Sequence, residues 1–272
     1  MEKFLRFLQT TMETPKPYGA FHLIAVAIVL VATFLVCFFF RDANDKTYRN
    51  VLIAIWAVMF VFEVFKQLMC SYTIMPDGEF VWEYQWYSFP LQLCSSPLWT
   101  LLPVAFLKDG KVRTAISAFM YTYILLGGLA TYIFPQTTFC PFVYINVQTL
   151  VHHGLQIMSC VYIAVRNRKT LINLRSFFYG FIVFVIAVAI ACIFNEVVPL
   201  LFHQHVDMFY IGRDSVKTMP VESFDAGWKK MPWFTHVLFY IAALTALAYI
   251  IHMVYYGINY YLKQRSKKKA KA

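Results

Sequence analysis

Long apolar stretches recur along almost the whole chain, and each is about 20 residues long. An α-helix of that length crosses a hydrocarbon core about 30 Å thick, and a backbone in lipid must satisfy its own hydrogen bonds. The period-two alternation that is typical of a membrane β-barrel is absent from the sequence. The pattern therefore predicts an all-α, polytopic transmembrane bundle of about seven helices, at residues 21–40, 51–70, 87–107, 114–134, 142–165, 177–200 and 233–262.

The rest of the chain consists of short loops and terminal segments, so we expect residues 1–272 to form a single integral membrane domain. Residues 1–19 are expected to lie as an interfacial segment on the outer membrane surface, with a frayed terminus as the alternative. Their apolar residues fall on one helical face: Phe4, Leu5, Phe7, Leu8 and Met12. This run is too short for a signal peptide. The longest loop, residues 201–232, is expected to pack over one end of the bundle.

Composition supports the membrane class. Hydrophobic residues make up 60% of the 272 positions and charged residues only 14%. A soluble domain of this length needs far more charge to cover its surface. The composition therefore excludes an ordinary soluble enzyme or binding module.

Basic residues predict the orientation of the bundle. If successive loops alternate sides, most of the 24 lysines and arginines fall on one side, together with the basic tail at 263–272. The loops 71–86 and 135–141 on the other side contain no basic residue. The positive-inside rule places the basic side in the cytoplasm, with the N-terminus outside and the C-terminus inside. The expected location is the cell membrane.

The net charge of +10 can indicate a nucleic acid partner. Here membrane topology and the anionic headgroups that attract a basic tail already account for it. We therefore expect membrane lipids as partners, with anionic headgroups at residues 263–272, and no nucleic acid.

Polar residues inside the predicted helices are the main functional signal. An ionisable side chain in hydrocarbon costs at least about 2.5 kcal/mol, so each one is a candidate for function. Glu63 and Lys66 lie three residues apart on one face of the second helix, where they can form an ion pair. The remaining candidates come from the third, fifth, sixth and seventh helices: Gln92, Cys94, Asn146, Gln148, His152, His153, Gln156, Glu196 and His236.

The assigned topology places these residues at a similar depth. Glu63 and Cys94 each fall about two turns from the outer end of their helix, and His152 and His153 nearly three turns. The inner halves of the same helices are almost purely apolar. The pattern predicts a polar pocket in the outer half of the bilayer. Its expected substrate-binding residues are Gln92, Asn146, Gln148, Gln156, Glu196 and His236.

Cys94 beside a histidine is the minimal pair of a nucleophile and a base. An imidazole can take the proton of a thiol and leave the reactive thiolate. Glu63 could orient that imidazole, and Lys66, Asn146 or Gln92 could donate a hydrogen bond to a developing oxyanion. In an apolar site, the natural substrate is an acyl ester or thioester that a lipid carries.

Structural explanations compete with this reading. A lone cysteine in a membrane helix is usually a small packing residue, and a Glu–Lys pair is more often a structural salt bridge. The run His203, His205 and Asp207 has the spacing of a metal site on a strand, but a solvated loop is the preferred interpretation. We expect neither a metal nor a cofactor.

Three stretches carry a resemblance to a known family: EVFKQ from Glu63, PLQLCSSPLWTLLP around Cys94, and HHG at His152. Together they resemble the YwaF-type bacterial integral membrane family, which distantly resembles an animal branch of membrane lipid acyltransferases. The similarity runs roughly from Glu63 to Gln156. One departure is Gln92, where the bacterial motif often has a histidine.

The resemblance implies a cysteine in a Pro-x-x-x-Cys-like helix that acts with a histidine two helices later. Carried over to this sequence, it implies catalytic roles for Glu63, Lys66, Cys94 and one of His152 or His153. His153, which immediately precedes the glycine, is the preferred histidine. The leading hypothesis is therefore a lipid acyltransferase or lipid-ester hydrolase with an intramembrane Cys–His site that faces the outer leaflet.

Two other classes stay open. A transporter or permease component could use the buried glutamate, lysine and histidines as a solute or proton site, although such proteins usually show internal repeats and midplane charges. A lipid-binding or scaffold protein without chemistry is the other alternative. It predicts that Cys94 and His153 are not in contact.

Overall fold

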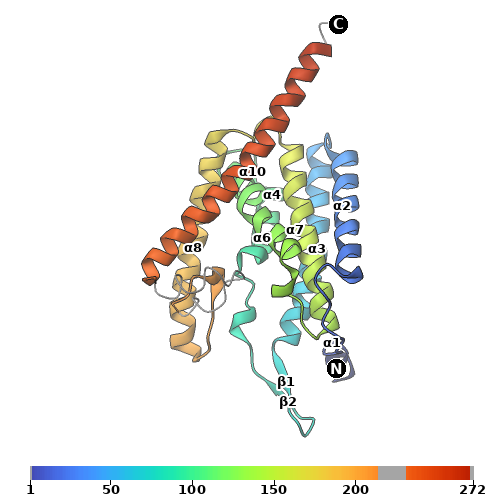
Figure 1. The fold of residues 1–272 in the computed structure, drawn as a ribbon, viewed down its shortest axis with the longest axis vertical. Coiled ribbons are helices and arrows are strands. Elements are labelled where there is room, and N and C mark those ends of the chain that lie inside the picture. Colours follow the sequence, from blue (N-terminus) through green and yellow to red (C-terminus); the bar gives the residue numbers. More distant parts are fainter. Residues whose placement is uncertain (1, 214–230, 270–272) are drawn as a thin grey trace.

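The computed structural model describes residues 2–213 and 231–269, and within them helices dominate (Figure 1). The only paired strands in this part of the chain form one short antiparallel hairpin. The helices are α1 (Glu2–Leu8), α2 (Ala20–Phe40), α3 (Asp45–Met69), α4 (Pro97–Phe106), α5 (Lys111–Phe119), α6 (Leu125–Ile133), α7 (Val143–Arg166), α8 (Leu174–Phe202) and α10 (Trp233–Lys269), and the strands are β1 (Tyr72–Ile74) and β2 (Phe80–Trp82).

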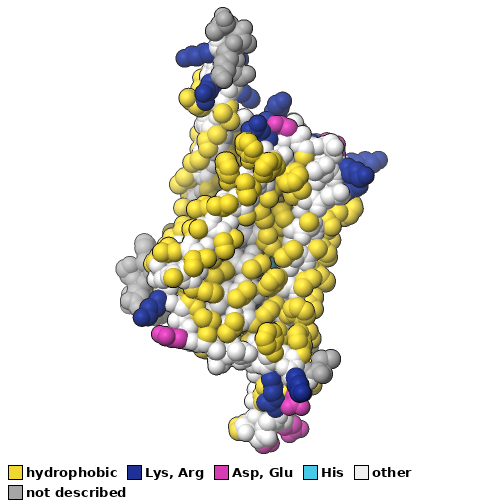
Figure 2. Space-filling model, turned by 90° about the vertical axis from the view of Figure 1, so that its right-hand side faces the viewer, with side chains coloured by type: hydrophobic (Ala, Val, Ile, Leu, Met, Phe, Trp, Pro, Cys, Tyr) yellow, Lys and Arg dark blue, Asp and Glu magenta, His cyan; other side chains and the backbone are white. Residues whose placement is uncertain are grey.

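The all-α membrane fold is confirmed. Within the described ranges, five helical stretches are long and apolar enough to cross a membrane: α2, α3, residues 111–133, α8 and α10. Figure 2 shows apolar side chains over the flank of the molecule, with lysine, arginine and acidic side chains gathered toward its two ends. This distribution fits a bundle whose middle faces hydrocarbon and whose ends face water.

The central helix of the bundle is α7, and it is not among those five. Its 24 residues pack against α2, α3 and α6. Most of its middle is buried, including Asn146, Gln148, His152, His153 and Gln156. The polar side chains of the sequence are thus turned inward, and neighbouring helices shield them from lipid.

The predicted third helix at 87–107 is wrong in its first half. The chain there forms two 3₁₀ turns, Trp86–Ser88 and Leu93–Ser95, and the α-helix begins only at Pro97. Proline disfavours a helical conformation in the residue before it, and Phe89 before Pro90 is extended, with a φ of −54° and a ψ of 133°. Pro97 lacks an N–H, which suits it to the first position of a helix. Pro97 therefore starts α4 instead of kinking a longer helix. Cys94 lies in the second of these 3₁₀ turns and not within an α-helix.

A second irregular segment runs from His203 to Arg213. Its residues Val206, Met208, Phe209 and Ile211 are buried, and Figure 1 shows the chain turning back toward the middle of the bundle after α8. The preference for a solvated loop at His203, His205 and Asp207 therefore holds only in part. The rest of the loop predicted at 201–232 lies outside the described residues.

The two termini lie at opposite ends of the bundle (Figure 1). An odd number of membrane crossings requires this arrangement. The loops after α2, α4 and α7 come together at the end opposite α1, where Arg168 pairs with Asp42 and Arg166 with Asp45. Which end faces the cytoplasm stays a prediction from the positive-inside rule.

The N-terminal segment packs on the protein. Leu5 and Leu8 of α1 are buried, the Tyr72 hydroxyl of β1 donates to the Leu5 carbonyl, and Phe4 contacts Phe65 of α3 edge-to-face at 5.5 Å. The helix expected in this segment is therefore present, and it lies against α3 and the hairpin.

Candidate functional site

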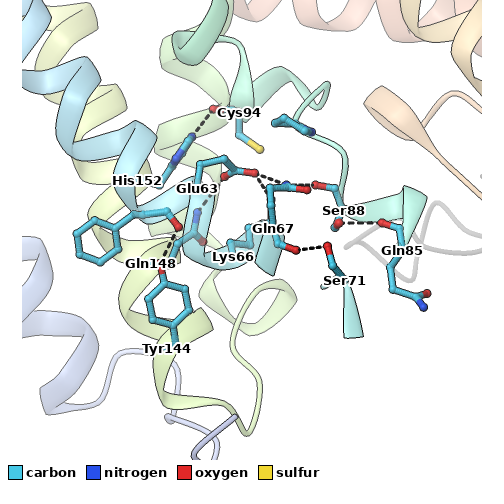
Figure 3. A network of polar contacts seen from close by, with 12 residues as sticks. Glu63, Lys66, Gln67, Ser71, Gln85, Ser88, Cys94, Tyr144, Gln148 and His152 are labelled. Atoms are coloured by element: carbon cyan, nitrogen blue, oxygen red, sulfur yellow. Dashed lines mark hydrogen bonds and ion pairs between the residues drawn. The ribbon is translucent and has the colours of Figure 1, made fainter. Parts of the chain in front are cut away.

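Glu63 organises a buried polar network between α3 and α7 (Figure 3). Its side chain is 5% exposed, and the Lys66 ammonium lies 3.1 Å from Oε1. Gln67 donates to the same oxygen at 2.6 Å, and Gln148 donates to Oε2 at 3.4 Å. Glu63, Lys66 and Gln67 follow the i, i+3, i+4 spacing of one helix face. The carboxylate thus has three donors, as a buried charge requires.

Gln67 connects this network to the irregular segment before α4. Its Nε2 also donates to the Ser88 carbonyl at 2.8 Å, and its Oε1 accepts from the Tyr84 hydroxyl at 2.6 Å. An irregular backbone inside a bundle needs such partners, because no helix satisfies its polar groups. Gln67 therefore fixes residues 84–88 on α3. Its spacing from Glu63 placed it on the same helix face, but the sequence did not predict this role.

Cys94 contacts His152 through its backbone. The His152 Nε2 lies 3.0 Å from the Cys94 carbonyl oxygen. A carbonyl only accepts, so Nε2 carries the proton in the neutral ring and Nδ1 is the free base. Nδ1 is buried and has no hydrogen-bond partner among the described residues. In Figure 3 the Cys94 sulfur points to the other side of its backbone from this imidazole.

The neighbouring His153 is engaged within its own helix. Its Nδ1 donates to the Thr149 carbonyl at 2.7 Å, and its ring centre lies 5.6 Å from that of His152. No hydrogen bond between His153 and Cys94 occurs in the part of the chain that the structure describes. The histidine next to Cys94 is thus His152, whereas the sequence favoured His153.

Gly127 of α6 lies between the backbone of Cys94 and the side chain of Gln156. A Cβ at this position would lie 3.7 Å from both the Cα and the backbone nitrogen of Cys94, and 3.3 Å from Nε2 of Gln156. Gln156 is fully buried and donates to the Ile124 carbonyl at 2.6 Å. That carbonyl belongs to a π-helical turn, Met120–Ile124, between α5 and α6. Gln156 therefore links α7 to this turn, on the side of Gly127 and Cys94.

Gln92 joins the two irregular segments. Its Nε2 donates to the Asp207 carbonyl at 2.7 Å, and its Oε1 accepts from the Phe209 amide at 2.7 Å. Asn195 of α8 makes the same double contact with the backbone of Met208, at 3.0 and 2.7 Å. These amides hold residues 207–209 beside the segment that carries Cys94.

The other predicted site residues lie apart from the Glu63 network. Asn146 is buried and pairs with both backbone groups of Cys140, at 2.7 and 3.0 Å. Glu196 forms an exposed ion pair with Arg213 at 2.6 Å. His236 is buried, and its Nε2 lies 3.1 Å from the Tyr210 carbonyl. The described structure thus separates a site around Cys94 from three contacts that hold loops.

The described ranges contain neither a disulfide bond nor a cluster of metal-binding side chains. All six cysteines are free thiols. Within residues 2–213 and 231–269, no three histidine, cysteine or acidic side chains lie close enough together to share a metal ion.

Comparison with known families identifies the family of this chain. The model of the TMEM164 family, a family of membrane proteins, matches residues 17–256. The matched range includes α2 to α8 and most of α10, with every residue of the Cys94 site. No curated protein and no solved structure matches the chain. The chain belongs to the TMEM164 family, and the likeness to YwaF proteins and lipid acyltransferases stays a prediction.

Proposed function

We propose that this TMEM164-family protein transfers or hydrolyses the acyl group of a membrane lipid, with Cys94 as nucleophile and His152 as base. The main support is a buried imidazole nitrogen without a partner, on a ring that contacts the residue bearing the thiol. A polar atom in that state is costly, so a chemical role is a reason to keep it. Cys94 itself is only partly buried, so its side chain keeps some accessible surface.

In the proposed reaction, Nδ1 of His152 takes the proton of the Cys94 thiol. The thiolate attacks the acyl carbonyl, the bond to the leaving oxygen breaks, and the imidazolium returns the proton to that oxygen. The product is an acyl thioester on Cys94. An alcohol or amine on a second lipid, or water, then attacks the thioester and regenerates the thiol. Rotation of the Cys94 side chain toward His152 is the step that substrate binding must promote.

The Glu63 network supplies the electrostatics of this proposal. Lys66 is the nearby cation, and its ammonium can donate to the oxyanion that forms on the acyl carbonyl. Glu63 balances that charge in the resting state at 3.1 Å. Gln148, one turn before His152 on α7, ties the carboxylate to the helix that carries the base. We place the reaction in the outer half of the cell membrane, as the topology predicts.

The test uses purified protein in lipid nanodiscs and the p-nitrophenyl ester of palmitic acid. The wild type is expected to release a burst of nitrophenolate and to gain one palmitoyl group by intact mass. Cys94→Ala should abolish both signals. His152→Ala should slow acylation about a hundredfold, the usual contribution of a general base, and His153→Ala should change it little.

Cys70 provides a matched control thiol. It lies just beyond α3, and burial raises the pKa of its thiol above the ordinary value of 9.0 while Lys66 opposes the shift. Unlike Cys94, Cys70 has no hydrogen bond to a histidine in the described part of the chain, so Cys70→Ala should leave acylation at pH 7 intact. If Cys94→Ala left acylation unchanged, Cys94 would be a packing residue. A lipid-binding scaffold would then be the leading hypothesis.

A solute or proton site is the second candidate. The observation in its favour is that two irregular segments, around Gln92 and Phe209, meet inside the bundle. Transporters build their sites from such interrupted segments. Uptake of a labelled solute or of protons into proteoliposomes, lost on Glu63→Gln but kept on Cys94→Ala, would favour this candidate over acyl transfer.

A further inference from the structure

A charged cavity of about 510 Å³ opens at the end of the bundle that carries the C-terminus. Three loops that are distant in sequence form it, those after α2, α4 and α7. Its basic wall consists of Arg41, Arg113, Arg166, Arg168 and Lys169. The positive-inside rule explains the presence of basic residues at this end. It does not explain why they surround one concave space.

Two arginines of this wall are held in place by backbone carbonyls. Arg113 Nε donates to the Val104 carbonyl at 2.9 Å, and Arg166 Nε donates to the Ala43 carbonyl at 2.7 Å. Each guanidinium has five N–H donors, so one anchored nitrogen leaves others for a ligand. An arginine with a fixed fork loses little freedom on binding an anion.

Two of these cations share one aromatic ring. The guanidinium carbons of Arg113 and Arg166 lie 5.5 and 5.6 Å from the ring centre of Tyr48, which is buried. The two like charges beside this ring repel each other, and nearby anions reduce that repulsion. The ring offsets part of that repulsion by cation–π attraction. A multiply charged anion in the cavity would offset the rest.

The acidic partners now present are exposed. Arg166 pairs with Asp45 at 3.3 Å and Arg168 with Asp42 at 3.1 Å, and the two carboxylate side chains are 88% and 68% exposed. Arg113 also pairs with Asp109, whose side chain is 90% exposed. Exposed ion pairs contribute little, so a stronger anion can replace these carboxylates. In the described structure, Lys169 has no acidic partner within ion-pair distance.

We propose that this cavity binds the phosphate group of a phosphorylated ligand. A phosphate presents several charged oxygens to arginine forks, which favours it over a carboxylate. The volume lies in the range of small-molecule sites and exceeds that of an inorganic phosphate, so it leaves room for an attached polar group. The ligand is either a phospholipid headgroup that enters from the bilayer or a soluble phosphate ester. The site lies at a different end of the bundle from α1 and does not depend on chemistry at Cys94.

The first experiment compares three probes by calorimetry, on the full-length protein in uncharged detergent micelles. The probes are dioctanoyl phosphatidic acid, glycerol 3-phosphate and dioctanoylglycerol. Phosphatidic acid should bind and dioctanoylglycerol should not. Glycerol 3-phosphate as tight as phosphatidic acid identifies a soluble phosphate ester, and binding more than tenfold weaker identifies a lipid headgroup. Equal binding of phosphatidic acid and dioctanoylglycerol overturns the proposal.

Variants then test the basic wall. Arg168→Gln and Lys169→Gln should each weaken phosphatidic acid binding about tenfold, the usual effect of one lost charged contact. Asp42→Asn removes a competing carboxylate and should tighten binding. Arg175→Gln is the matched control, because Arg175 lies near this end in the first turn of α8 but does not line the cavity.

Equal losses in Arg175→Gln and Arg168→Gln would show general attraction to a basic surface and would overturn the site. Melting temperatures without ligand identify any variant that fails to fold. Lys169 is exposed, so Lys169→Gln keeps the test valid if Arg168→Gln does not fold. Unchanged affinity in a folded Lys169→Gln and a folded Asp42→Asn would also count against the proposal.

Discussion

Glu63 and Lys66 form the ion pair that their spacing predicts. The burial of each side chain determines how much it contributes to stability. Glu63 is 5% exposed, whereas Lys66 keeps 21% of its side-chain surface. Breaking a fully buried pair by removing one partner costs about 3–5 kcal/mol. Because the lysine still touches solvent or headgroups, the expected cost here is smaller.

We therefore expect Lys66→Met to lower the free energy of unfolding by about 2 kcal/mol, because it leaves a buried carboxylate without its cation. Adding Glu63→Gln should recover most of this loss, since the amide oxygen still accepts from Gln67. Melting in detergent micelles measures both effects. Lys16→Met, at an exposed lysine, is the control. A double variant less stable than Lys66→Met would contradict the assignment.

Residue types identified part of the site but not its geometry. Glu63, Lys66, Gln148, Cys94 and His152 were predicted and lie together. Tyr84 and Ser88 could not be predicted, because they join the site through an irregular segment whose path depends on tertiary contacts. The choice between His152 and His153 rests on a rotation of 100° around α7, which the hydrophobic pattern of a buried helix does not fix.

At the scale of elements, α8 ends at Phe202, and His203 caps it with a φ of 54° and a ψ of 26°. This left-handed conformation closes the helix, and its amide donates to the Pro199 carbonyl at 3.1 Å. Glycine is the usual residue at such an end, because a Cβ there is unfavourable. The exposed imidazole of His203 therefore sits on a strained backbone.

His203→Gly is expected to raise stability by about 1 kcal/mol, because the left-handed conformation no longer carries the strain of a Cβ. His205→Gly is the matched comparison: His205 is also exposed, but its φ is not positive, so the substitution should cost about 0.5 kcal/mol of backbone entropy. The two melting temperatures should move in opposite directions. If both substitutions shifted the melting temperature in the same direction, the backbone strain at the end of α8 would not be what limits stability.

Helices with a strong apolar pattern could be predicted from the sequence, whereas the interrupted segment at 87–107 could not. The expected helix at 21–40 corresponds to α2 at Ala20–Phe40, whereas the expected helix at 87–107 is helical only from Pro97. Its apolar composition is genuine, but it reflects burial of an irregular segment. Pro90 and Pro97 were the available signal, since a proline-flanked stretch of this length does not sustain a helix.

On the scale of the whole molecule, the hairpin and the C-terminal end of α10 lie at opposite ends (Figure 1). We predict that an epitope inserted after Asp77, in the turn of the hairpin, is accessible to antibody on intact cells. An epitope at the C-terminus should require permeabilisation, because the positive-inside rule predicts that the basic loops face the cytoplasm. Both epitopes on one side would contradict an odd number of crossings. The reverse accessibility would contradict the positive-inside assignment.

The burial of a polar α7 at the centre of the bundle also bears on how the protein is made. A helix that leaves the translocon alone must partition into lipid on its own side chains, and α7 exposes two histidines and several amides in that state. Three of those groups have their partners outside α7: Gln148 contacts Glu63 of α3, His152 contacts the carbonyl of Cys94, and Gln156 donates to the carbonyl of Ile124 in the turn before α6. Stable insertion of α7 therefore has to wait for its neighbours, so the ribosome-bound chain must keep the earlier helices close by until the centre of the bundle arrives.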